Sequence, residues 1–275
     1  MPPEQAFERQ LEALRRNCEA AAQCFYGHQA INEMALRRQA VHRALNRNGM
    51  FWSTTAGAMQ VAAFIAMGRV FDQGSPHNVD RLLKLAQGQP SLFSREALRR
   101  RKQDRDATPP SWLDAYMPGV HVPAPAEFRR LRAHVKKHRQ LYEKSYKTLR
   151  DKYFAHSEIA DEADIENIFS KTSKREIERL LLFLIRLHDS LWHLYMNGHR
   201  PTLRALPRSV KPSGRLTLPR TQLSGLHRRM TRDTADILNR IAAQPAVTGG
   251  ARAGGCGHGG GGAGHRQQRP LVVAG

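Results

Sequence analysis

The chain has 275 residues, which is enough for one large or two small domains with a buried core and excludes a peptide-scale or disulfide-stapled scaffold. Lysine plus arginine total 44 against 24 aspartate plus glutamate, and the formal net charge of +20 favours acidic partners, with nucleic acid first. The alternative is an arginine-rich surface that only contacts solvent, so the positions of the cations have to decide.

Cysteine content and apolar tracts bear on the compartment. Three cysteines cannot form a disulfide framework, and their number fits a reducing compartment. The first residues lack a basic stretch followed by an apolar one, and the longest apolar tracts, 56–67 and 180–185, are shorter than a bilayer span. We therefore expect a cytoplasmic protein that does not enter a membrane.

The N-terminal part of the chain has the apolar spacing of helices throughout. Steps of three and four between apolar residues predict two helices within residues 4–46, with a break near Gly27. Residues 51–71 are apolar on nearly every side, which predicts the most buried helix of the protein. Two shorter helices are expected at about residues 78–87 and 93–102.

The middle of the chain begins with a segment that cannot be helical throughout. Residues 104–125 contain five prolines and predict a crossover loop. A long helix is expected at about 126–157, and another at 174–197 with Gly198 as its stop. Because no stretch alternates between apolar and polar residues as a strand does, the chain is expected to be all-α.

The C-terminal part changes in composition. A basic, proline-rich stretch predicts an irregular connector, and a last helix is expected at about 226–242. After Gln244 the sequence is rich in glycine, which predicts a disordered tail. These boundaries give a helical bundle, a connector, a C-terminal helix and a tail, at residues 1–199, 200–221, 222–243 and 244–275.

Two stripes of side chains on the helix predicted at 126–157 end in residues with useful chemistry. An apolar stripe with a period of seven residues ends in His156, and a mainly basic stripe beside it ends in Arg150. The pair predicts a basic groove that leads to an acid–base residue. The alternative is a half-buried histidine at a helix end with a surface arginine nearby. The stripes comprise Phe128, Val135, Tyr142 and Leu149, and Arg129, Lys136, Glu143 and Arg150.

The segment around these two residues resembles a known motif. Residues 149–157, Leu-Arg-Asp-Lys-Tyr-Phe-Ala-His-Ser, are similar to the Arg-x4-6-His motif of the HEPN superfamily, in which a polar residue commonly follows the arginine. Residues 48–52, 68–72 and 196–198 resemble segments of its abortive-infection U-type (AbiU-like) branch. The resemblance covers roughly residues 5–243 and implies an all-α, HEPN-like helical bundle with a long proline-rich crossover loop.

The resemblance also implies a function. Many members of the superfamily are homodimers that cleave RNA without a metal ion or other cofactor and act as toxins or antiphage effectors. By this resemblance His156 transfers protons and Arg150 binds the phosphate, roles that suit an imidazole titrating near neutral pH and a planar guanidinium. Asp151 either orients an imidazole of a second subunit or pairs with Arg150. An antitoxin protein is a candidate partner, and a non-catalytic module that binds RNA or a protein is the alternative function.

The spacing of Arg150 and His156 constrains how they act together. Six residues of helix separate two side chains by about 9 Å along the axis and about 120° around it, so one regular helix does not place both on one phosphate. Either the helix is interrupted between them, or two subunits share the site. We expect a homodimer built around residues 149–157.

Further cations are candidates for contacts with RNA phosphates, and their alternative role is a solvated surface. Two histidines, His134 and His138, have the spacing of a zinc pair but lack a convincing third ligand, so no metal site is expected. The candidate RNA-binding residues are Arg99, Arg100, Arg129, Arg132, Lys136 and Arg139.

Overall fold

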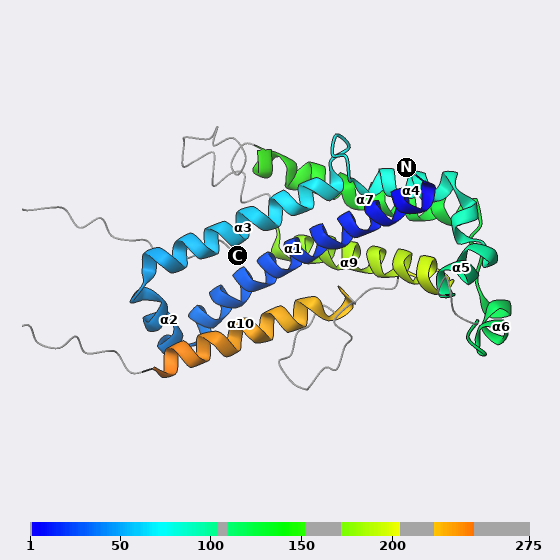
Figure 1. Cartoon of the computed structure of the whole chain (residues 1–275). Coiled ribbons are helices and arrows are strands. Elements are labelled where there is room, and N and C mark those ends of the chain that lie inside the picture. Colours follow the sequence, from blue (N-terminus) through cyan, green and yellow to red (C-terminus); the bar gives the residue numbers. More distant parts are fainter. Residues whose placement is uncertain (1, 104–108, 152–171, 204–222, 245–275) are drawn as a thin grey trace, which may run out of the picture.

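The computed structural model describes residues 2–103, 109–151, 172–203 and 223–244, and this part of the chain is all-α, with no strand. The long helix α1 (Pro3–Arg37) forms its centre. It packs against α3 (Gly49–Phe71) on one side and α10 (Leu226–Ala243) on the other, while α9 (Lys174–Asn197) crosses behind it (Figure 1). The short α2 (Gln39–Asn46) connects α1 to α3.

Helix α1 is continuous, although the sequence predicted a break near Gly27. The helix carries buried apolar residues on one face, and Gly27 lies within the helix, where the Met230 side chain packs closely against it. A Cβ atom at this position would lie 2.9 Å from Met230 Cε on α10. The glycine therefore serves the close approach of two helices and does not end the first one.

Helix α3 is buried only in part and less than α9, so the expectation that it is the most buried helix was wrong. Its second half packs into the core through residues such as Phe64, Met67 and Phe71, whereas Met50 is 82% and Phe51 63% exposed at its start. Within the described ranges α3 alone has the length and apolar composition of a membrane span, a test that core helices also meet. The cytoplasmic location of the protein stays a prediction.

A second group of helices covers one end of α1. Helix α4 (Val79–Gly88) packs against α7 (Pro125–Ser145), and α5 (Arg95–Lys102) follows a short 3-10 turn at Pro90–Phe93. The predicted crossover contains α6 (Leu113–Tyr116) and a 3-10 turn at Met117–Gly119. These elements pack on the core through aromatic contacts, with ring centroids 5.4 Å apart for Phe7 and Phe93 and 5.2 Å apart for Phe93 and Phe128.

Helix α7 ends twelve residues earlier than the sequence predicted, at Ser145 instead of Ser157. Tyr146 interrupts it, residues 147–148 are helical again, and residues 149–151 form a wider, π-type turn. The Tyr146 side chain is fully buried, and its hydroxyl donates to the Ser173 carbonyl oxygen at 3.0 Å, just before α9 begins. The helix is therefore interrupted at the residue whose side chain is attached to the start of α9, and this attachment fixes the direction of the Tyr146 side chain.

The last two helices agree with the predictions. Helix α9 begins and ends at the predicted residues, and Gly198 stops it with a φ of 60°, a conformation that favours glycine. Helix α10 ends one residue later than expected and packs along α1. Most of the predicted connector and nearly all of the glycine-rich tail lie outside the described residues, so both stay predictions.

Candidate functional site

Arg150 is held between two carboxylates at the end of α3. Its Nε donates to Asp151 Oδ1 at 2.6 Å, and its Nη1 forms an ion pair with Asp72, the residue that caps α3. The side chain is only 15% exposed. Of the two roles considered for Asp151, pairing with Arg150 is the one that this structure contains.

Gly68 makes this position of Arg150 available. A Cβ atom on Gly68 would lie 2.7 Å from Arg150 Cδ and 3.1 Å from the Tyr142 hydroxyl oxygen. The Arg150 side chain therefore crosses α3 at a position where α3 has no side chain. Tyr142 lies next to the Arg150 side chain at Gly68, and its ring is held in place by stacking on Phe71 with centroids 5.2 Å apart. Residues 68–72, for which the sequence suggested only a family likeness, thus form a seat for the arginine.

Electrostatics fix the protonation states of this cluster. Burial is the largest single influence on Arg150 and opposes its charge, but the hydrogen bond to Asp72 and the interactions with Tyr142 and Asp151 together outweigh it, so the pKa of Arg150 is raised. Burial also raises the pKa of Tyr142, which stays a neutral phenol at physiological pH. Arg150 is therefore a permanent, oriented cation, and proton transfer has to come from another group.

An open hollow of about 760 Å³ lies beside Arg150. We call it the motif hollow. Three cations and three carboxylates line it, so its formal charges balance, and Ile65 supplies an apolar wall. The six charged residues are Arg69, Lys147, Arg150, Asp72, Glu143 and Asp151.

His156, the predicted proton-transfer residue, lies outside the described residues. It belongs to the sequence segment that begins directly after Asp151. Because α7 ends at Ser145 and residues 149–151 form a π-type turn, Arg150 is not part of one regular helix running from residue 126 to His156. This break lies before Arg150, whereas the interruption that the sequence left open lies between Arg150 and His156, outside the described residues. Whether Arg150 and His156 meet stays a prediction.

The six candidate RNA-binding residues fall into two groups. Arg100, Arg129 and Lys136 are exposed. The other three have partners within the protein: Arg99 donates to Asp114 at 2.7 Å, Arg132 donates to Gln87 at 3.2 Å, and Arg139 forms an ion pair with Asp80. Arg132 and Arg139 thus connect α7 to α4. A role in RNA binding stays a prediction for all six.

The two histidines considered for zinc also have a structural setting. His138 is half-buried, and its ring stacks on Phe183 with centroids 3.6 Å apart. Its Nδ1 is 2.9 Å from the backbone carbonyl oxygen of His134. That contact makes Nδ1 a donor to the helix backbone instead of a lone pair for a metal ion.

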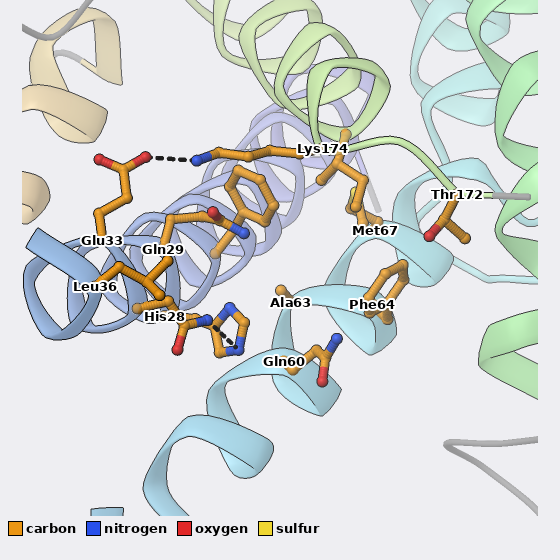
Figure 2. Close-up of a pocket in the computed structure, with 13 residues that line it drawn as sticks. His28, Gln29, Glu33, Leu36, Gln60, Ala63, Phe64, Met67, Thr172 and Lys174 are labelled. Atoms are coloured by element: carbon orange, nitrogen blue, oxygen red, sulfur yellow. Dashed lines mark hydrogen bonds and ion pairs between the residues drawn. The ribbon is translucent and has the colours of Figure 1, made fainter. Parts of the chain in front are cut away.

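A second cavity, of about 200 Å³, lies where α1 and α3 diverge near the start of α9 (Figure 2). An ion pair of 2.5 Å between Glu33 and Lys174 spans it, and His28 Nε2 is 3.3 Å from the Asn32 amide nitrogen. Burial, helped by the charge of Lys174, lowers the pKa of His28 and keeps it neutral. The residues of α3 that line this cavity, including Phe64, lie on the face opposite Arg69, so it is separate from the Arg150 site.

Comparison with protein families identifies the family of the chain. The family model HEPN_AbiU2, described as AbiU2, matches residues 4–211. The chain belongs to the AbiU2 family of HEPN domains. No curated protein and no solved structure matches it. The AbiU2 match includes both the seat at residues 68–72 and the Arg150–His156 segment, and it makes the chain an abortive-infection HEPN domain.

One residue that sequence analysis missed is Asp72. The sequence contained its signal, because Asp72 ends a segment singled out for its likeness to AbiU proteins. Its role could not be assigned, since nothing in the spacing of residues 72 and 150 shows that α3 ends beside Arg150. The ion pair between them is a tertiary contact across 78 positions of sequence.

The seat predicts opposite effects for two glycines of α3. Gly57→Ala should raise the free energy of unfolding by roughly 0.5–1 kcal/mol, because a Cβ there meets no atom within 4 Å and alanine favours a helix. Gly68→Ala should lower it by roughly 1–3 kcal/mol, because the new methyl group displaces Arg150. Urea unfolding followed by circular dichroism measures both, and a stabilising Gly68→Ala would contradict the seat.

Proposed function

We propose that this AbiU2 protein is a metal-independent endoribonuclease of the toxin or antiphage type, with Arg150 as the phosphate clamp and His156 as the proton-transfer group. One observation carries the proposal: the motif's guanidinium is charged, held in place by Asp72 and located at an open hollow, directly before the segment that contains His156. A guanidinium held in this way matches two oxygens of a phosphate through parallel hydrogen bonds.

The reaction that suits these groups is internal transesterification of RNA. A base removes the proton of the 2′-hydroxyl, the 2′-oxygen attacks phosphorus, and the 5′-oxygen leaves with a proton, which produces a 2′,3′-cyclic phosphate and a 5′-hydroxyl. Arg150 stabilises the negative charge that develops on the non-bridging oxygens. To do so it exchanges one carboxylate contact for the phosphate, and Asp151 is the partner on the more exposed side, at 35% against 24% for Asp72. DNA, which lacks the nucleophile, should stay intact.

The same site supports a homodimer as the active form. A single proton-transfer residue has to serve both the attacking and the leaving oxygen, and a regular helix from Arg150 to His156 would point the two side chains about 120° apart. A second copy of the chain, with its own residues 149–157 near the twofold axis, supplies the missing group across the interface. An antitoxin protein that covers the motif hollow belongs to the same proposal.

The charge balance of the motif hollow favours a second candidate function. With three carboxylates next to three cations, Arg150 has no net positive field around it in this state. A non-catalytic AbiU2 module would need no free clamp and would regulate by binding RNA or a protein. The two functions are distinguished by whether the protein cleaves the RNA: the nuclease produces cleaved RNA and the binding module does not.

The nuclease proposal predicts cleavage of single-stranded RNA in the presence of EDTA. Arg150→Ala and His156→Ala should each lower the rate by about 100-fold or more, as expected for a lost charge-stabilising or proton-transfer group. Arg101→Ala is the matched control, because Arg101 is also a mostly buried arginine paired with a carboxylate, Glu4 at 2.9 Å, and is not among the candidate RNA-binding residues, so it should keep most of the activity. Gel electrophoresis of labelled RNA measures the rates.

RNA that stays intact with the folded wild-type dimer, or cleavage that survives both substitutions, would exclude the proposed chemistry. RNA binding without cleavage would support the non-catalytic module instead.

A shared site predicts complementation between two inactive variants. Mixed and re-equilibrated, Arg150→Ala and His156→Ala chains should recover up to about a quarter of wild-type activity, because half of the dimers are mixed and each has one complete site. Each variant alone serves as the control. If the mixture stays as inactive as its components while light scattering shows mixed dimers, each subunit holds its own complete site.

A further inference from the structure

A second hollow, of about 480 Å³, opens beside the motif hollow and has a different charge. We call it the arginine hollow. Two of its arginines, Arg9 and Arg16, come from α1, and the third, Arg69, comes from α3. Asn17, Ser75 and His77 complete its polar lining, and no carboxylate belongs to it.

These three arginines are poorly compensated by the protein. In the part of the chain that the structure describes, Arg9 and Arg69 are exposed and form no ion pair. Arg16 has only a long contact, 3.5 Å from its Nε to Glu12, and Glu12 is already held by Arg15 at 2.7 Å. Three guanidinium groups from two helices therefore converge on one hollow without opposite charge. Such a cluster raises the local positive potential and favours the binding of an anion.

The arginine hollow adjoins the motif hollow, because Arg69 and Ser75 line both. Neighbouring phosphates of one strand could therefore lie one in each hollow. The two hollows differ in what they offer. The motif hollow holds an oriented clamp in balanced charge, whereas the arginine hollow offers net positive charge and donors that need no rearrangement.

We propose that the arginine hollow binds a backbone phosphate of the same RNA strand whose neighbouring phosphate reaches Arg150. The assignment to RNA depends on the proposed function, whereas the phosphate chemistry stands on the hollow alone. Guanidinium groups recognise phosphate through paired N–H donors and do not read the sugar or base. A DNA strand should therefore bind here as RNA does, and only the cleavage step should distinguish the two.

The test measures binding of a labelled RNA strand of about twelve nucleotides by fluorescence anisotropy, with the full chain carrying His156→Ala so that the strand stays intact. Adding Arg9→Ala and Arg16→Ala together should weaken binding by about tenfold or more at moderate salt. The slope of log affinity against log salt should become shallower by about 1.4, because each lost contact with a single strand contributes about 0.7.

Arg43→Ala is the matched control. Arg43 is an exposed arginine on α2, which lies at the end of the molecule away from α4 and α5 (Figure 1), and its loss should leave affinity and slope unchanged. Because Arg9 and Arg16 are exposed, the double variant should keep the parent's melting temperature in buffer without phosphate. The same strand made as DNA should lose affinity in parallel.

Each outcome is decisive. Binding and salt slope equal to those of the parent would overturn the proposal. The proposal would also be overturned if the arginine hollow bound only free anions. In that case inorganic phosphate would raise the melting temperature of the parent but not of the double variant, and RNA binding would be the same in both. If the arginines prove necessary for RNA binding but wild-type protein does not cut RNA, the nuclease proposal fails and the subsite stands. If wild-type protein cuts RNA and the double variant binds and cuts equally well, only the subsite fails.

Discussion

The ion pair between Arg150 and Asp72 is the contact on which the rest of the site depends. A guanidinium that is mostly buried has to be neutralised, because an uncompensated charge away from water is costly. Asp72 and Asp151 supply that compensation, and the first of them ties the end of α3 to the turn after α7. Gly68 leaves the space through which the arginine passes. Removing either the carboxylate or the space would move Arg150, the cation of the motif hollow that the two aspartates hold in place.

This arrangement separates two tasks that a nuclease has to perform. The balanced charges of the motif hollow orient a single guanidinium but give little long-range attraction for a polyanion. The arginine hollow beside it has the opposite properties, with net positive charge and no fixed partners. Under the proposed function, the arginine hollow supplies affinity for the strand and Arg150 supplies orientation at the reacting phosphate. Because the arginine hollow carries net positive charge, attraction of a polyanion does not require that the excess positive charge of the chain, +20 in total, lie around Arg150.

Much of the fold follows from the sequence, and most of the site does not. Helical periodicity gave α9 to the residue, because its apolar face is regular and Gly198 is the only type that tolerates its stop. It failed at Gly27 and Tyr146, where packing against α10 and a bond to Ser173 decide the outcome. The motif's arginine was visible in the sequence, but its seat was not, since Asp72 and the arginine hollow arise from contacts between helices that are far apart in the chain.

The most direct measurement of the central claim compares two aspartates that pair with arginines of the α7 region. Asp72→Asn and Asp80→Asn each remove the charge opposite one arginine, Arg150 or Arg139, and should cost similar stability. At saturating RNA, the account predicts that Asp72→Asn lowers the turnover number by about tenfold or more with little change in KM, whereas Asp80→Asn leaves it near the wild-type value. Equal turnover in both variants would contradict the claim that Asp72 sets the position of Arg150 for catalysis.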